Sequence, residues 1–154
     1  MRSERIGDSP ACDVARRWLL APRLAVDLQR LDSWMVDESA RAGVSWPGLW
    51  IISGHRPSPV APSLSPGTPA AEQSLHLECP SLAADLRVGN QPASQTPLVV
   101  WGALGAHWQN VLGHRWGGGF EPPDPNHFDM GQPLYFHRTV GSVGPPTSVN
   151  AGPF

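Results

Sequence analysis

A single carboxylate in the middle of an apolar run constrains the fold of this chain more than any other feature. The run Leu82-Ala83-Ala84-Asp85-Leu86-Arg87-Val88 ends at Gly89-Asn90. Its length and composition predict a buried strand that is closed by a turn. A buried aspartate is costly unless it pairs with a cation or binds a metal ion. We therefore predict that Asp85 is a metal ligand, with a pair to Arg87 or another arginine as the alternative.

Helical and strand patterns precede this run. Apolar residues at helical spacing between Val14 and Ala42 predict amphipathic helices that are interrupted at Ala21-Pro22 and stopped by Gly43. The apolar run at 49–52 predicts a second buried strand. We expect the helices to cover one face of a sheet that contains both strands.

Further helix, strand and loop signals follow along the chain. Thr96-Pro97 is a favourable helix start, and the predicted helix runs to Gly113. A short strand is predicted at 133–136, and the proline-rich stretch 57–73 predicts a long functional or mobile loop. These patterns divide the chain into a partly helical N-terminal extension (1–23), a domain (24–138) and a disordered C-terminal tail (139–154).

Composition excludes some classes of partner. A chain of 154 residues has the length of one domain. Its formal net charge of -2 gives no basic field that would favour nucleic acid or an anionic membrane. The apolar stretch Trp18-Leu19-Leu20-Ala21 is too short for a signal sequence or a membrane span, so we expect a protein that is cytoplasmic as synthesised. We also expect a monomer in which Cys12 and Cys79 are free thiols.

Two further segments carry polar side chains of the kinds that a metal site needs. Ser53-Gly54-His55-Arg56 directly follows the predicted strand at 49–52, which would deliver its side chains to the strand end. Asp124-Pro125-Asn126-His127 places a carboxylate three residues before an imidazole. Such a short pattern is weak alone and is also typical of a turn.

These two segments, together with the segment from His76 to Asp85, contain a set of possible zinc ligands. A catalytic zinc ion usually has three nitrogen or oxygen ligands from the protein and one position for water. His76, Asp85 and His127 can fill these three positions. Asp124 then remains for proton transfer, and Arg56 for stabilising negative charge.

Other residues compete for these roles. Cys79 follows His76 in an H-x-x-C arrangement, but a thiolate would favour a closed structural site and would leave Asp85 unexplained. His107 and His114 are seven residues apart at the C-terminal end of the helix predicted from Thr96-Pro97, and we expect them to face solvent and not to form a second metal site.

With these segments in this order, residues 24–137 resemble a family of zinc D-alanyl-D-alanine carboxypeptidases, vancomycin-resistance dipeptidases and phage L-alanyl-D-glutamate endolysins. The family motif S-G-Y/H-R matches Ser53-Gly54-His55-Arg56. The motif S-x-H-x-x-G-x-A-x-D matches Ser74, His76, Ala83 and Asp85, although the interval from His76 to Asp85 is two residues longer than in the family. We expect a loop bulge to absorb these residues.

The most specific part of the resemblance lies near the C-terminus. The motif L-G-x-x-W-G-G-x-F/W matches Leu112-Gly113-His114-Arg115-Trp116-Gly117-Gly118-Gly119-Phe120. The following D/E-x-x-H-F/W-E motif matches Asp124-Pro125-Asn126-His127-Phe128-Asp129, where Asp129 replaces the more common glutamate. An aspartate at the position of Asp124 is more similar to the endolysin branch than to the dipeptidases.

The resemblance implies a function and a fold. It implies an α+β domain of the Hedgehog type, with helices on one face of a small antiparallel sheet and zinc at the open edge. His76, Asp85 and His127 would hold Zn2+, and Asp124 and Arg56 would be catalytic. The expected activity is hydrolysis of peptidoglycan stem peptides, favouring the L-Ala-D-Glu bond and acting on the cell wall after release. A D-Ala-D-Ala carboxypeptidase and a catalytically silent zinc-stabilised binding module remain alternatives.

Overall fold

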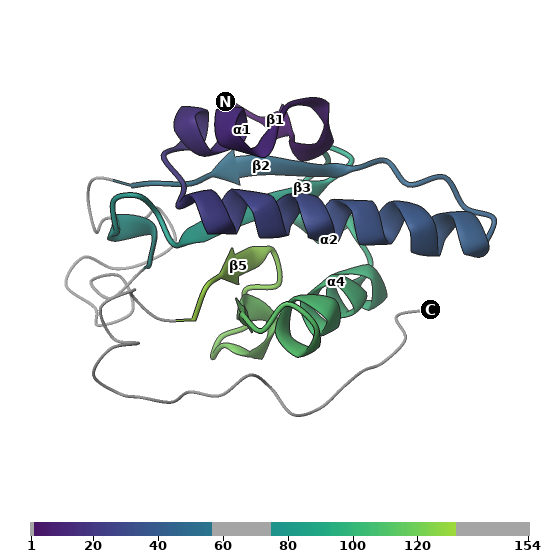
Figure 1. The fold of residues 1–154 in the computed structure, drawn as a ribbon. Coiled ribbons are helices and arrows are strands. Elements are labelled where there is room, and N and C mark those ends of the chain that lie inside the picture. Colours follow the sequence, from purple (N-terminus) through teal and green to yellow (C-terminus); the bar gives the residue numbers. More distant parts are fainter. Residues whose placement is uncertain (1, 57–74, 132–154) are drawn as a thin grey trace.

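Five short strands form one antiparallel sheet in the structure, a computed structural model that describes residues 2–56 and 75–131 (Figure 1). The strands follow the order β1-β2-β3-β5-β4, and every neighbouring pair is antiparallel. Their bounds are β1 (Glu4–Arg5), β2 (Leu49–Ser53), β3 (Ala83–Val88), β4 (Arg115–Trp116) and β5 (His127–Asp129). The strand predicted at 133–136, the loop at 57–73 and the tail at 139–154 lie outside the described residues.

Within residues 2–56 and 75–131, three α-helices and four short 3-10 helices accompany the sheet. They are α1 (Ala11–Trp18), α2 (Pro22–Arg41), α4 (Leu98–Asn110), η1 (Ile6–Asp8), η2 (Leu75–Leu77), η3 (Ala93–Gln95) and η4 (Gly117–Gly119). The predicted interruption at Ala21-Pro22 is confirmed, because Pro22 is the first residue of α2, where its missing N–H breaks no hydrogen bond. Gly43 follows α2 with a φ of 72°, a conformation that glycine adopts without strain. Helix α4 ends at Asn110, earlier than the predicted Gly113.

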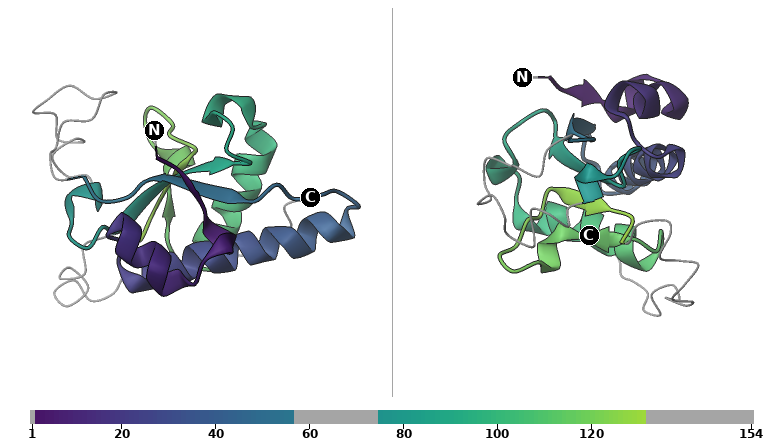
Figure 2. Two further views of the ribbon diagram at one scale, coloured as in Figure 1. Left: turned by 90° about the horizontal axis from the view of Figure 1, so that it is seen from above. Right: turned by 90° about the vertical axis from the view of Figure 1, so that its left-hand side faces the viewer.

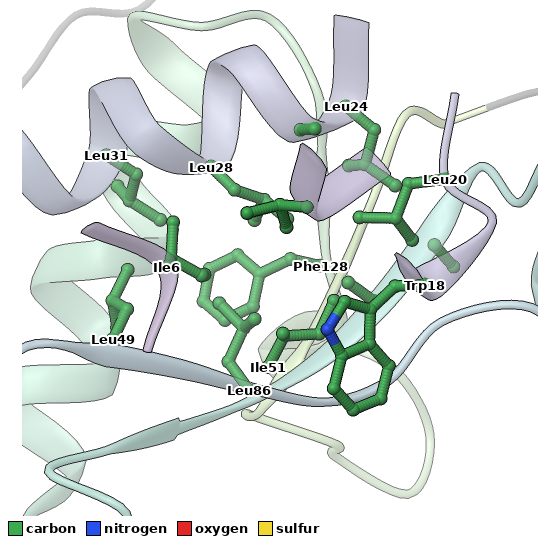
Figure 3. Packing of buried hydrophobic residues seen from close by; sticks show 14 of the residues in the cluster. Ile6, Trp18, Leu20, Leu24, Leu28, Leu31, Leu49, Ile51, Leu86 and Phe128 are labelled. Atoms are coloured by element: carbon green, nitrogen blue, oxygen red, sulfur yellow. The ribbon is translucent and has the colours of Figure 1, made fainter. Parts of the chain in front are cut away.

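Helices α2 and α4 pack on the same face of the sheet, which confirms the predicted α+β architecture (Figure 1). The side chains buried between α2 and the sheet include Leu24, Leu28, Leu31, Leu49, Ile51, Leu86 and Phe128 (Figure 3). Trp101 and Trp108 of α4 contact the same Phe128 ring, with centroids 6.2 and 5.7 Å away. Full burial of one such side chain typically contributes about 1.5–3 kcal/mol, so this face supplies most of the core.

The N-terminal segment contributes to this same core. Strand β1 pairs with β2, and α1 lies beside α2 in both views of Figure 2. Ile6, Val14 and Leu20 are at most 2% exposed and belong to the one hydrophobic cluster. The part predicted as a partly helical extension, residues 1–23, therefore supplies an edge strand and a helix to the domain.

The opposite face of the sheet is polar where β3 and β5 meet. Successive side chains on a strand point to opposite faces, so Phe128 faces the helices while His127 and Asp129 face away from them. Asp85 is paired directly with His127 and shares its face. An irregularity in β2 between Ile51 and Ser53 brings Ser53 opposite Asp85. The polar face is thus built by strand register.

Candidate metal centre

His76, Asp85 and His127 converge on the polar face and form a group that could hold a metal ion. The Nε2 atom of His76 lies 3.3 Å from both the Nδ1 atom of His127 and the Oδ1 atom of Asp85. His127 Nδ1 lies 3.2 Å from the same carboxylate oxygen. The three residues are 1%, 9% and 7% exposed, respectively, so the group is set below the surface.

His76 reaches this group from η2 although its interval to Asp85 is longer than the resemblance predicts. The Arg56 N–H donates to the His76 carbonyl over 2.8 Å, which ties η2 to the segment after β2. Between the two ligands, Ser81 exchanges backbone hydrogen bonds with Leu19 and Ala21, at 2.7 and 2.9 Å. The residues between His76 and Asp85 are therefore held beside the end of α1, and both side chains still reach the group.

Each histidine makes a second contact that fixes which nitrogen faces the group. His76 Nδ1 lies 2.7 Å from the Gly54 carbonyl, which can only accept, so Nδ1 carries the proton. His127 Nε2 lies 2.8 Å from Asp129 Oδ2, so this nitrogen is the donor. The lone pairs of His76 Nε2 and His127 Nδ1 then face Asp85 Oδ1. Such an arrangement requires a cation at the centre, either a metal ion or a proton.

A proton on His127 can take this central position. Burial opposes the charged form of His127, but its hydrogen bonds to Asp129 and Asp85 outweigh burial and raise the pKa of His127 to about 9. Burial likewise opposes ionisation of Asp85, yet the bonds from His127 and His76 hold the pKa of Asp85 well below its usual range. The carboxylate is therefore ionised and ready to bind a cation.

Arg56 binds the other oxygen of the Asp85 carboxylate. Its guanidinium donates to Asp85 Oδ2, and its Nε donates to Ser53 Oγ over 3.0 Å. Asp85 therefore contacts an arginine at Oδ2 and the two imidazoles at Oδ1. The arginine pair that was the alternative for Asp85 is thus present beside the group that could hold a metal ion. The Arg56 side chain remains 30% exposed, so part of its cation is open to solvent beside the group.

Asp124 lies three residues before His127, and its carboxylate is close enough to Asp85 and to both histidines for their charges to act on its pKa. Its N–H donates to the Gly117 carbonyl over 2.8 Å, and its own carbonyl accepts from the His127 N–H over 3.1 Å. Among the described residues its carboxylate has no hydrogen-bond partner, and the residue is exposed to solvent. Partial burial and the nearby charge of Asp85 nevertheless raise the pKa of Asp124. This carboxylate can take up and release a proton more readily near neutral pH than an ordinary aspartate.

The structure corrects the prediction for His114. This residue lies after α4, not within it, and its side chain is only 9% exposed. Its Nε2 lies 2.7 Å from Oδ2 of the fully buried Asp27, which also accepts from Arg23 and Arg30. A buried carboxylate needs such partners, so His114 is a structural residue and does not face solvent. His107 is partly covered, since it stacks on Trp34 with ring centroids 3.9 Å apart.

Two residues of this site were part of the quoted motifs but were not assigned a role from the sequence. Asp129 and Arg115 lie opposite each other on β5 and β4 and form an ion pair at 2.8 Å. Asp129 follows His127 by two residues on one strand, which places both side chains on the same face of the sheet. This spacing could have predicted their contact from the sequence. Cys79, the rival candidate, is exposed and is not part of the group that could hold a metal ion.

The chain was compared with models of protein families, with curated proteins and with solved structures, and none of them matches. Among the residues that the structure describes, no helix combines the length and the apolar character needed to cross a membrane. The case for a function therefore depends on the residues of the site and on the motifs in the sequence.

Proposed function

We propose that this protein is a zinc metallopeptidase that hydrolyses peptide bonds in bacterial peptidoglycan stem peptides, with the L-Ala-D-Glu bond as the favoured target. One observation carries the proposal: two imidazole nitrogens and one carboxylate oxygen meet within 3.3 Å, beside a carboxylate and a guanidinium that are not part of the trio. A hydrolytic zinc site needs such ligands, and a nearby carboxylate and guanidinium can transfer a proton and stabilise the negative charge that develops.

The donor set favours zinc over other common metal ions. Two imidazoles and one carboxylate suit zinc, whereas calcium and magnesium prefer oxygen ligands alone. The imidazole rings of His76 and His127 are oriented by hydrogen bonds to the Gly54 carbonyl and to the Asp129 carboxylate. The two rings are therefore in position before any ion binds. When bound there, zinc acts as a Lewis acid that acidifies water and polarises a peptide carbonyl.

The remaining residues have roles that follow from their positions. Asp124 is exposed to solvent and its raised pKa suits a group that accepts a proton and later returns it to the leaving amine. The Arg56 guanidinium has five N–H donors, and its bonds to Asp85 and Ser53 leave others for the negative charge that develops on the attacked carbonyl oxygen.

Digestion of purified peptidoglycan, followed by mass spectrometry of the products, tests the proposal. We expect new N-termini on D-Glu, loss of activity with a chelator and recovery after zinc is added back. Release of terminal D-Ala would assign the carboxypeptidase activity instead. A protein that binds zinc but leaves every peptide bond intact would be a zinc-stabilised binding module. Cleavage that resists the chelator would contradict the zinc mechanism.

A further inference from the structure

The Asp129 carboxylate has more hydrogen-bond partners than the single cation of a simple ion pair. It is fully buried, and both of its oxygens accept hydrogen bonds. Oδ2 accepts from His127 Nε2 and from Arg115 Nη2, each over 2.8 Å. Oδ1 accepts from Arg115 Nε over 3.0 Å and from the Gly131 N–H over 2.7 Å. With these partners the carboxylate has one orientation available, and one oxygen points at His127.

Arg115 connects this carboxylate to a second side of the His127 ring. It lies opposite Asp129 in the pairing of β4 with β5, so strand register brings the two together. Its guanidinium also lies over Phe120, 4.9 Å from the ring centroid. Phe120 in turn contacts His127, with 5.4 Å between ring centroids. The His127 imidazole is therefore held at Nε2 by Asp129 and also contacts the tilted ring of Phe120.

We infer that Asp129, fixed by Arg115, is a positioning residue that makes Nδ1 of His127 the metal-binding nitrogen. The carboxylate takes the proton of Nε2 as its hydrogen bond, so only Nδ1 presents a lone pair to Asp85 and His76. His76 is oriented in the opposite sense by the neutral Gly54 carbonyl and presents Nε2. The inference uses the metal site of the proposed function but not its peptidase activity.

The test compares zinc affinity and histidine tautomers in the full chain. Asp129→Asn removes the charge and the paired acceptors for Arg115, while Asp129→Glu keeps a carboxylate. The matched control is Asp13→Asn, which breaks an exposed pair with Arg16. We measure the zinc Kd by competition with a chromophoric chelator, and the protonation of ring nitrogens by long-range 1H–15N NMR.

We expect Asp129→Asn to weaken zinc binding about 10- to 100-fold and, in the zinc-loaded protein, to remove the uniform Nε2-H tautomer of His127. Asp129→Glu should recover part of the affinity, Arg115→Lys should give a smaller loss because lysine cannot make the paired contact, and Asp13→Asn should match the parent. If the Asp129–Arg115 ion pair were purely structural, its loss would instead lower the free energy of unfolding in chelator and leave the zinc Kd of the folded protein unchanged.

The outcomes separate this inference from the proposed function. If folded Asp129→Asn has the zinc Kd and the His127 tautomer of the parent, the inference is overturned. If Asp129→Asn does not fold, a parental zinc Kd and tautomer in both Arg115→Lys and Asp129→Glu would overturn it. A parent that binds no zinc would overturn both the inference and the proposed metal. A parent that binds zinc without cutting peptidoglycan, with weak binding in Asp129→Asn, would support the inference and remove only the peptidase.

Discussion

Asp85 and His127 are direct partners across the antiparallel pair β3 and β5, and the Asp85 Oδ1 atom lies 3.2 Å from the His127 Nδ1 atom. Both residues are on regular strands, so the backbone hydrogen bonds of the sheet set their separation. His76 joins them from η2, and its backbone carbonyl accepts a hydrogen bond from the Arg56 N–H. A ligand group built in this way is expected to exist before the metal binds and to couple metal binding to the stability of the sheet.

Zinc should stabilise the folded protein. A ligand that binds only the folded state at 100 times its Kd adds about 2.7 kcal/mol to the free energy of unfolding. Urea unfolding at buffered free zinc, compared with unfolding in chelator, measures this increment. His127→Ala should lose it, whereas His107→Gln, which changes a histidine stacked on Trp34, should retain it. An equal increment in parent and His127→Ala would place the zinc elsewhere.

The metal-free protein should lose stability as the pH rises from about 6.5 to about 9. The pKa of folded His127 is raised from 6.5 to about 9, because its bonds to Asp129 and Asp85 outweigh burial. The stabilisation by this proton is complete below the unfolded pKa and is lost as pH rises through the folded pKa. The loss is on the order of 3 kcal/mol. Urea unfolding in chelator across this range measures it, and His127→Gln should give a flatter profile.

Asp124→Asn should abolish most of the proposed peptidase activity and leave the proposed zinc binding intact. Asparagine keeps the size of the side chain but cannot accept a proton, and general acid-base catalysis typically contributes about 10²- to 10⁴-fold. The rate of stem-peptide cleavage and the zinc Kd are measured on the same preparation. Glu121→Gln removes a nearby exposed carboxylate and serves as the matched control. Parental cleavage by Asp124→Asn would remove Asp124 from the mechanism.

Arg56→Lys should lower the cleavage rate even when zinc is saturating. Lysine keeps the charge but loses the planar set of donors that binds Asp85 and Ser53 and would face the substrate. Loss of one donor to a developing oxyanion commonly costs about 10²- to 10³-fold in rate. Arg41→Lys, whose side chain is 72% exposed, is the control. If excess zinc restores the full rate, Arg56 acts only by holding Asp85.

Gly117→Ala should destabilise the protein, and Gly119→Ala should not. A Cβ at Gly117 would lie 2.3 Å from the Asp124 carbonyl oxygen and 2.8 Å from the His127 Cβ, whereas at Gly119 it would meet nothing within 4 Å. Forcing a methyl group into such a contact typically costs about 1–3 kcal/mol. The free energies of unfolding in urea measure the difference. The Gly117 variant should also cleave more slowly, because the backbone of Asp124 must move.

The helices and inner strands were predictable because their signals are local. The period of apolar residues, Pro22 at the start of α2 and Gly43 after its end each act within a few residues of themselves. The environment of His114 was not predictable in this way. Its partner Asp27 is 87 positions away in the sequence, and helical spacing around His114 contains no information about α2.

The sequence by itself determined that the aspartate among apolar neighbours needs a cation, and it identified His76, His127, Asp124 and Arg56 as residues with suitable chemistry. Only the tertiary structure decided how Asp85 divides its oxygens between Arg56 and the imidazoles, and that Asp129 orients His127. The physical reason is that these contacts follow from strand register and from the turn between His76 and Asp85. Residue type states what a side chain can bind, whereas register and backbone hydrogen bonds determine which atom faces its partner.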